Sequence, residues 1–145
     1  MNYSEFKKEN SKEIDEFISK YFVFAFSKEQ HEKVIKKLGL TDEEFQAQYT
    51  GYLGGAIPIN KVDEFKKIGE ETNKRMRHKM LDDSEFAKEA FRYEMGNFEV
   101  YYSGRYSEVL GVLCVTHKDI ETYAGLKKAY ESARKEYWQW ACENC

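Results

Sequence analysis

The stretch NKVDEFKKIGEETNKRMRHKM (residues 60–80) has the clearest helical pattern in the chain. Apolar side chains and one threonine recur along it every three or four residues, at Val62, Phe65, Ile68, Thr72, Met76 and Met80. This spacing places them on one face of a helix, and that face must be buried against other elements. Asn60 and Asp63 offer a cap where the helix starts, and LDDSEF (81–86) interrupts it. The pattern predicts a domain whose core is made mainly by packed helices.

Further helices are predicted on both sides of this stretch. Apolar spacing predicts a helix that ends near residue 20, and Ser27 with Gln30 is a capping pair for the next helix, which Gly39 closes. Other helices are predicted after Thr41, from about residue 84 to Gly96-Asn97, within residues 107–115, and after Thr116. The last helix is expected to bury Leu126, Tyr130, Ala133, Tyr137 and Trp140.

Three short segments are predicted to be extended. YFVFAF (21–26) is aromatic and bounded by polar segments, which is typical of a buried strand. TGYLGGAIPIN (50–60) predicts a turn and a short strand, with Gly54 and Gly55 in a tight turn. FEVYY (98–102) alternates like a half-buried strand. The sequence therefore predicts a helix-rich α+β fold, a single domain over residues 1–145 with a sheet of two or three strands. Residues 1–10 are candidates for fraying, and residues 142–145 form a tail.

Composition and charge exclude several classes of protein. The chain has 145 residues, a net charge of −3 and an aromatic share of 16%. A nucleic-acid binder usually carries a clear basic excess, and a DNA mimic needs a much stronger acidic one. The longest apolar run, residues 21–26, is far shorter than the roughly 20 residues that span a bilayer. A polar N-terminus and an odd number of cysteines favour the cytoplasm.

Cysteine and histidine occur near the C-terminus with the spacing of zinc ligands. Cys114 and His117 form one pair, and Cys142 and Cys145 form another. Residues 119–142 are predicted to be mostly helical, and a helix of that length runs roughly 35 Å. The two pairs would then lie at opposite ends, so a shared zinc site is disfavoured. We expect no metal and no cofactor, with Cys114 as a small core residue.

Two carboxylates flank a predicted helix end. Glu94 lies in the last helical turn, where the helix dipole disfavours an anion, so it needs a partner. Glu99 follows just beyond the turn, and such a pair can perform acid–base catalysis or hold a divalent ion. No histidine, serine nucleophile or third acid adjoins them. The favoured interpretation is structural, with Glu94, Asn97 and Glu99 bonded to backbone and to nearby tyrosines. No catalytic residue is assigned.

A basic segment lies at the end of the long helix. Lys74, Arg75, Arg77 and Lys79 occur within NKRMRHKM (73–80), which contains no acidic residue. One hypothesis is a surface for nucleic acid or for an acidic partner. The favoured alternative is that these cations complement the helix dipole, because the same helix begins with Asp63 and Glu64.

Several segments together resemble a known family. They are YFVFAFSKEQ (21–30), GGAI (54–57), FRYEMGNFEVYY (91–102), VLGV (109–112) with THKDI (116–120), and LKKAYESARKEY (126–137). Over residues 20–135 the chain resembles small proteins carried by phages and mobile elements of bacteria, which show a Y-E-L-x-N-H-E-Y motif. Tyr93, Glu94, Asn97 and Glu99 match that motif, whereas Phe98 replaces its histidine. The resemblance implies an accessory role in the conflict between bacteria and mobile elements.

Three functions are consistent with these observations. The favoured one is a non-enzymatic phage or mobile-element protein that binds and inhibits a bacterial host protein. Its expected target is a defence component, with Cas9 as the leading class, as for anti-CRISPR proteins. The candidate contact residues are Trp138, on the polar side of the last helix, Arg134, Lys74, Arg75, Arg77 and Lys79. A homodimer is a further hypothesis. The alternatives are a small enzyme acting on a nucleotide through Glu94 and Glu99, and a nucleic-acid-binding module.

Overall fold

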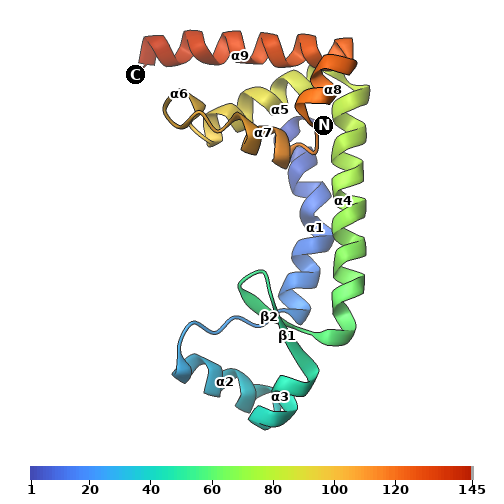
Figure 1. The fold of residues 1–145 in the computed structure, drawn as a ribbon, viewed down its shortest axis with the longest axis vertical. Helices are drawn as coiled ribbons and strands as arrows, with labels where there is room; N and C mark the ends of the chain where they lie inside the picture. The colour runs from blue at the N-terminus through green and yellow to red at the C-terminus, as the bar shows by residue number, and fades with distance from the viewer. Residues whose placement is uncertain (145) are drawn as a thin grey trace. The chain divides into compact units, whose positions relative to one another are not determined.

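Helices dominate the computed structural model, which describes residues 1–144 (Figure 1). One two-stranded antiparallel sheet accompanies them in this part of the chain, so the predicted helix-rich α+β class is confirmed. The chain forms two compact units. The hairpin unit comprises residues 11–70, and the helical unit comprises residues 1–10 together with the chain from residue 71 onward.

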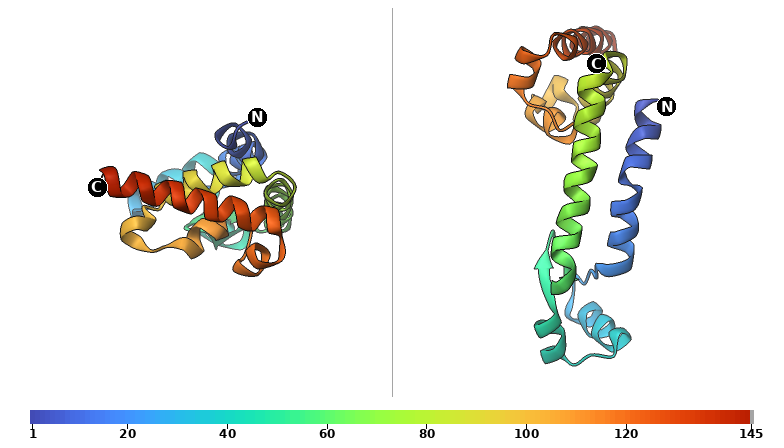
Figure 2. Two further views of the ribbon diagram at one scale, coloured as in Figure 1. Left: turned by 90° about the horizontal axis from the view of Figure 1, so that it is seen from above. Right: turned by 90° about the vertical axis from the view of Figure 1, so that its right-hand side faces the viewer.

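The helical unit contains most of the helices. It takes the start of α1 (Tyr3–Tyr21) and the end of α4 (Val62–Asp82). It also holds α5 (Ser84–Asn97), α6 (Val100–Ser103), α7 (Tyr106–Val112), α8 (His117–Thr122) and α9 (Ala124–Asn144). α5 and α9 lie side by side, which is clear from above in Figure 2. Asp83 caps the start of α5 by accepting a hydrogen bond from the Phe86 amide.

The core of the helical unit is closely packed. Phe91 and Met95 of α5 have no exposed surface, and neither has Leu113, which follows α7. Ala87 of α5 and Ala133 of α9 are also fully buried, and such small residues let helices approach closely. Tyr3 belongs to this core with 1% of its surface exposed. The first helical turn therefore has a buried anchor, which the polar composition of residues 1–10 does not predict.

The hairpin unit contains the sheet. It takes the end of α1 and the start of α4, and between them lie α2 (Lys28–Leu38), α3 (Asp42–Gln48), β1 (Tyr49–Tyr52), β2 (Gly55–Pro58) and the 3₁₀ helix η1 (Ile59–Lys61). The caps predicted for α2 and α3 are confirmed: the Ser27 hydroxyl accepts from the Gln30 amide at α2, and Thr41 with Glu44 forms a full capping box at α3. The cap predicted at Asn60 is wrong, because Asn60 lies inside η1 and α4 begins at Val62. Gly39 closes α2 in the left-handed conformation.

The turn between β1 and β2 needs backbone that few residues tolerate. Leu53 and Gly54 both have positive φ, at 50° and 82°, and the strands pair with Tyr52 opposite Gly55. A two-residue turn with φ positive at both positions is type I′, which matches the twist of a hairpin. The predicted tight turn at this place is confirmed.

The strand predictions for residues 21–26 and 98–102 are wrong. Within residues 21–26 only Val23 forms a bridge, to Ala56, and Phe24 and Phe26 are exposed. The segment is short because it leaves α1 directly and then enters the cap of α2, where the Phe26 amide donates to the Gln30 side chain. Residues 98–102 are not a strand either, since Glu99 has a φ of 49° and the chain winds into α6.

Candidate functional site

The carboxylate of Glu94 is enclosed within the helical unit. It accepts hydrogen bonds from the Tyr3 hydroxyl and the Lys7 ammonium, both at 2.8 Å, and from the Asn97 amide at 3.2 Å. Lys7 supplies the opposite charge that a buried carboxylate requires. Glu94 thus has the partners that its position at a helix end predicts.

Tyr3 and Lys7 reach Glu94 from one face of α1. Burial, and then the Glu94 carboxylate, raise the pKa of the Tyr3 hydroxyl far above its usual range. The hydroxyl therefore stays protonated and donates a hydrogen bond to Glu94. The Lys7 ammonium also lies 5.5 Å from the centre of the Tyr93 ring. Tyr3 and Lys7 are not among the site residues predicted from the sequence. Their i, i+4 spacing was the available signal, because residues so spaced share a helix face.

Glu99 lies in a different environment. It is exposed, and its carbonyl accepts hydrogen bonds from the amides of Tyr102 and Ser103 at the start of α6. Glu94 by contrast has no exposed surface. With one carboxylate enclosed and the other facing solvent, the two are not arranged as a shared acid–base pair.

Arg77 joins α4 to the start of α8. Its guanidinium donates to both carboxylate oxygens of Asp119, at 2.6 and 2.9 Å, and also to the Cys114 carbonyl. This bidentate contact holds the pKa of Asp119 well below its usual range. Asp119 also completes the capping box of α8 with Thr116, as the sequence predicts. Arg77 is therefore engaged within the protein, and its side chain keeps 40% of its surface exposed.

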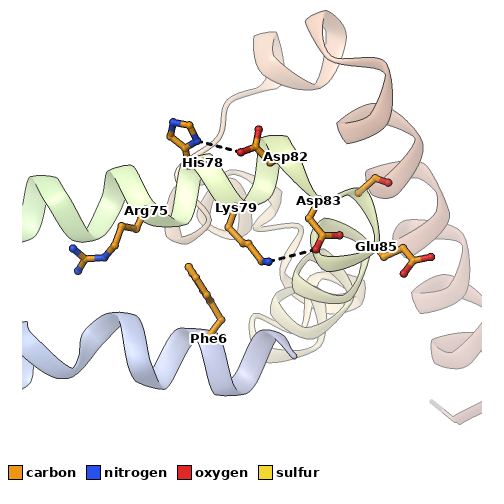
Figure 3. Close-up of a pocket in the computed structure, with 8 residues that line it drawn as sticks. Phe6, Arg75, His78, Lys79, Asp82, Asp83 and Glu85 are labelled. Carbon is orange, nitrogen blue, oxygen red and sulfur yellow. Dashed lines mark hydrogen bonds and ion pairs between the residues drawn. The ribbon is translucent and has the colours of Figure 1, made fainter. Parts of the chain in front are cut away.

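Two of the other basic residues, Arg75 and Lys79, border an open hollow in the helical unit, with a volume of about 810 Å³ (Figure 3). Lys79 forms an ion pair with Asp83 at 3.5 Å, and the His78 Nδ1 atom lies within hydrogen-bond distance of the Asp82 carboxylate, at 3.2 Å. Arg75 donates to the Asn10 side chain at 2.7 Å. The hollow therefore presents both signs of charge. Of the four predicted basic residues, Lys74 is the one whose side chain has no hydrogen bond or ion pair within residues 1–144.

The cysteine and histidine residues of the predicted metal pattern are only partly described. Cys114 is half-buried in the left-handed conformation, and burial raises the pKa of its thiol. Cys142 is exposed, and Cys145 lies outside the described residues. Within residues 1–144, no three His, Cys, Asp or Glu side chains are grouped so that they could hold a metal ion.

An aromatic cluster forms where α6, α7 and α9 meet. Trp138 is half-buried rather than exposed, and its indole nitrogen donates to the Tyr106 hydroxyl at 2.7 Å. Its ring lies 4.9 Å from that of Tyr101, and the Arg134 guanidinium lies 5.3 Å from the centre of the Tyr106 ring. Tyr102 packs edge-on against Tyr101 and remains 71% exposed. We call these five residues the aromatic cluster.

The predicted inner face of the last helix needs one correction. Leu126, Ala133 and Tyr137 are buried as predicted, but Trp140 is 47% exposed. Trp140 stacks on Tyr137 and lies beside the Arg92 guanidinium. Its ring is therefore covered by Tyr137 and Arg92 rather than by the core, although the neighbouring Ala141 is fully buried.

The comparisons with known proteins bear on the family alone. No curated protein and no solved structure matches the chain. A family model described as "Family of unknown function (DUF7659)" matches residues 2–136, which include Glu94 with its partners and most of the aromatic cluster. Since this match covers most of the sequence, the chain belongs to the DUF7659 family of unknown function.

Proposed function

We propose that this chain is a non-enzymatic accessory protein of a phage or mobile element that binds and inhibits a bacterial host protein. A defence component is the proposed target, with a nuclease of the Cas9 class as the first to test. The observation that carries this proposal is the aromatic cluster, in which two of the predicted contact residues, Arg134 and Trp138, come together.

The geometry of the cluster suits protein recognition. Tyrosine, tryptophan and arginine are the residues most often found at the energetic centre of an interface. The Trp138 indole donates the 2.7 Å hydrogen bond to the Tyr106 hydroxyl, and the Tyr101 amide donates one to the Tyr137 hydroxyl. Side chains fixed in this way lose little rotamer freedom when a partner arrives. Tyr102 projects to solvent from the same cluster, so a partner can reach it.

The alternatives draw less support from the same residues. An acid–base enzyme centred on Glu94 would need a carboxylate that substrate can reach, whereas this one is enclosed and has three donors. A nucleic-acid module would need free cations in the basic segment. Arg77 and Lys79 are paired with acids there.

The decisive experiment titrates inhibition against target concentration. A host-protein binder inhibits in proportion to its amount, so inhibition should saturate near one or two copies per target. Complete inhibition at a small fraction of the target concentration, with turnover of a substrate, would show an enzyme and overturn the proposal. The target class is tested by adding purified Cas9 to the full chain and measuring DNA cleavage.

A surface variant links the activity to the cluster. Tyr102→Ser should weaken target binding about tenfold or more, because a central aromatic contact contributes about 2 kcal/mol. Tyr123→Ser is the matched control, since Tyr123 is another exposed tyrosine of the helical unit, lies outside the cluster and is 43% exposed. Equal effects of the two variants on binding, measured by calorimetry, would remove the cluster from the proposed interface.

A further inference from the structure

The segment that joins α1 to α2 forms an open edge beside the sheet of the hairpin unit. We call residues 22–26 the strap. Val23 pairs with Ala56 of β2 through two backbone hydrogen bonds, each of 2.9 Å. Neighbouring residues of an extended chain direct their backbone groups to opposite edges, so the amide and carbonyl of Phe24 point away from β2. Neither group has a hydrogen-bond partner among residues 1–144.

The strap carries a row of three phenylalanine rings on one face. Phe22 stacks on Phe24 with ring centres 5.8 Å apart, and Phe24 stacks on Phe26 at 6.5 Å, with planes inclined by 16° and 18°. The exposed fraction rises along the row from 8% at Phe22 to 44% at Phe24 and 80% at Phe26. The row therefore begins in the core of the hairpin unit and continues into solvent.

The ring of Phe24 packs directly against the backbone at Gly55. A Cβ atom at Gly55 would lie 2.7 Å from a ring carbon of Phe24 and 3.0 Å from the Val23 carbonyl oxygen. The ring thus rests directly on the backbone of β2, and an aromatic side chain covering a strand glycine is a known device for fixing strand register. The exposed edge and its rings are consequently presented in one defined arrangement.

We propose that a second copy of this chain docks on the strap, which pairs antiparallel with its own counterpart about a two-fold axis at Phe24. Each Phe24 amide donates to the Phe24 carbonyl of the other copy. In that register Phe22 of one copy faces Phe26 of the other, so the row of rings is self-complementary. The two sheets then join into one across the axis. This inference concerns self-association and is independent of the proposed host target.

The symmetry of the strap favours a second copy as its partner, and the area that two copies bury limits the stability of the dimer. A two-fold contact requires a patch that is complementary to itself. The strap meets this requirement, because its Phe-x-Phe-x-Phe sequence is centred on the amide and carbonyl of Phe24, which are unpaired within residues 1–144. A phenylalanine buries about 150–250 Å², so the exposed parts of Phe24 and Phe26 from two copies supply on the order of 500 Å². Stable interfaces bury about 1,200 Å² or more in total. The dimer should therefore be weak and should form reversibly as concentration rises.

Sedimentation of the full chain under reducing conditions tests the association. The expected result is a monomer that converts to a dimer with increasing concentration. Phe26→Lys should weaken the dimer about tenfold or more, since a charge then faces Phe22 and exposed edge lysines oppose strand pairing. Leu53→Asn is the matched control, because Leu53 is 73% exposed in the same unit and asparagine tolerates its positive φ. It should leave the dimer unchanged.

A cross-linking experiment tests the register. In a chain with Cys114, Cys142 and Cys145 replaced by serine, Val23→Cys of one copy should face Ala25→Cys of the other. Such a pair, without mutual hydrogen bonds, has Cα atoms about 4.5 Å apart, within reach of a disulfide. A mixture of the two variants should cross-link on oxidation, and neither variant alone should. A monomer at every concentration, a dimer indifferent to Phe26→Lys, or equal cross-linking by one variant alone would each overturn the proposal.

Discussion

The two units differ in how completely they enclose their cores. In the helical unit Phe91, Met95 and Leu113 have no exposed surface. In the hairpin unit the core cluster consists of Phe17, Phe22, Ile57, Phe65 and Ile68, and all but Ile57 keep 6–9% of their surface exposed. A smaller core stabilises less, because less apolar surface leaves water. Opening fluctuations should therefore concentrate in the hairpin unit.

Truncation of one core phenylalanine in each unit gives the largest expected effect. Phe91→Ala should lower the free energy of unfolding by about 3–5 kcal/mol, because the cavity lies in an enclosed site. Phe65→Ala should cost less, since Phe65 is already in partial contact with solvent. Urea unfolding gives the two losses, and hydrogen exchange assigns each loss to a unit. A larger loss for Phe65→Ala would reverse the comparison.

Replacing the two glutamates of the motif should have very different effects on the stability of the protein. Glu94→Ala leaves the Tyr3 hydroxyl without its acceptor and Lys7 without its counter-charge, which should cost about 2–4 kcal/mol. Glu99→Ala should change stability by less than about 0.5 kcal/mol, as is usual for exposed residues without side-chain contacts. Thermal unfolding of both variants checks this. Equal losses would mean that Glu99 has a structural role that its exposure does not suggest.

The ion pair between α4 and α8 should make the helical unit sensitive to acid. Asp119→Asn should cost roughly 1.5–3 kcal/mol at neutral pH, because charge-assisted hydrogen bonds are lost. The folded pKa of Asp119 is lowered, so its contribution is full above the unfolded value near 4 and is lost as pH falls through the folded value. Urea unfolding of both proteins should therefore show their difference shrinking below about pH 4. A difference that grows in acid would contradict the assignment.

Two glycines of the hairpin should respond differently to an added methyl group. Gly55→Ala should cost about 1–2 kcal/mol, because the Phe24 ring and the Val23 carbonyl must move. Gly51→Ala is the control, since its Cβ would meet only the Gly55 carbonyl at 4.0 Å, and it should be close to neutral. Thermal unfolding measures both. Gly55→Ala should also raise the exposure of Phe24, which fluorescence of a bound hydrophobic dye can follow.

Local signals in the sequence account for most of the helices. Capping depends on side chains three residues apart, so Ser27, Thr41 and Thr116 could be recognised without knowledge of the fold. The alternating pattern at residues 98–102 was misleading, because the left-handed backbone at Glu99 turns that segment into α6. The aromatic run at residues 21–26 was misleading as well, since α1 and α2 bound this segment and only Val23 of it forms a bridge.

The candidate sites were harder to predict than the helices, because they are formed by contacts between residues that are distant in the sequence. The need of Glu94 for a partner was predictable from the helix dipole. The identity of the partners was not, because Tyr3 and Lys7 lie 91 and 87 residues away in the chain. Helical spacing places Trp138 on a polar face, but spacing alone does not show that Tyr101 and Tyr106 cover that face.

The anchoring of Tyr3 by Glu94 has a consequence for synthesis of the chain. Tyr3 is synthesised 91 residues before its partner Glu94. Translation proceeds at about 5–20 residues per second, so Tyr3 waits for roughly 5–20 s without its acceptor. Residues 11–70 are complete in that interval and have a core of their own. The hairpin unit can therefore begin to fold first, while the N-terminal turn stays open to chaperones until α5 appears.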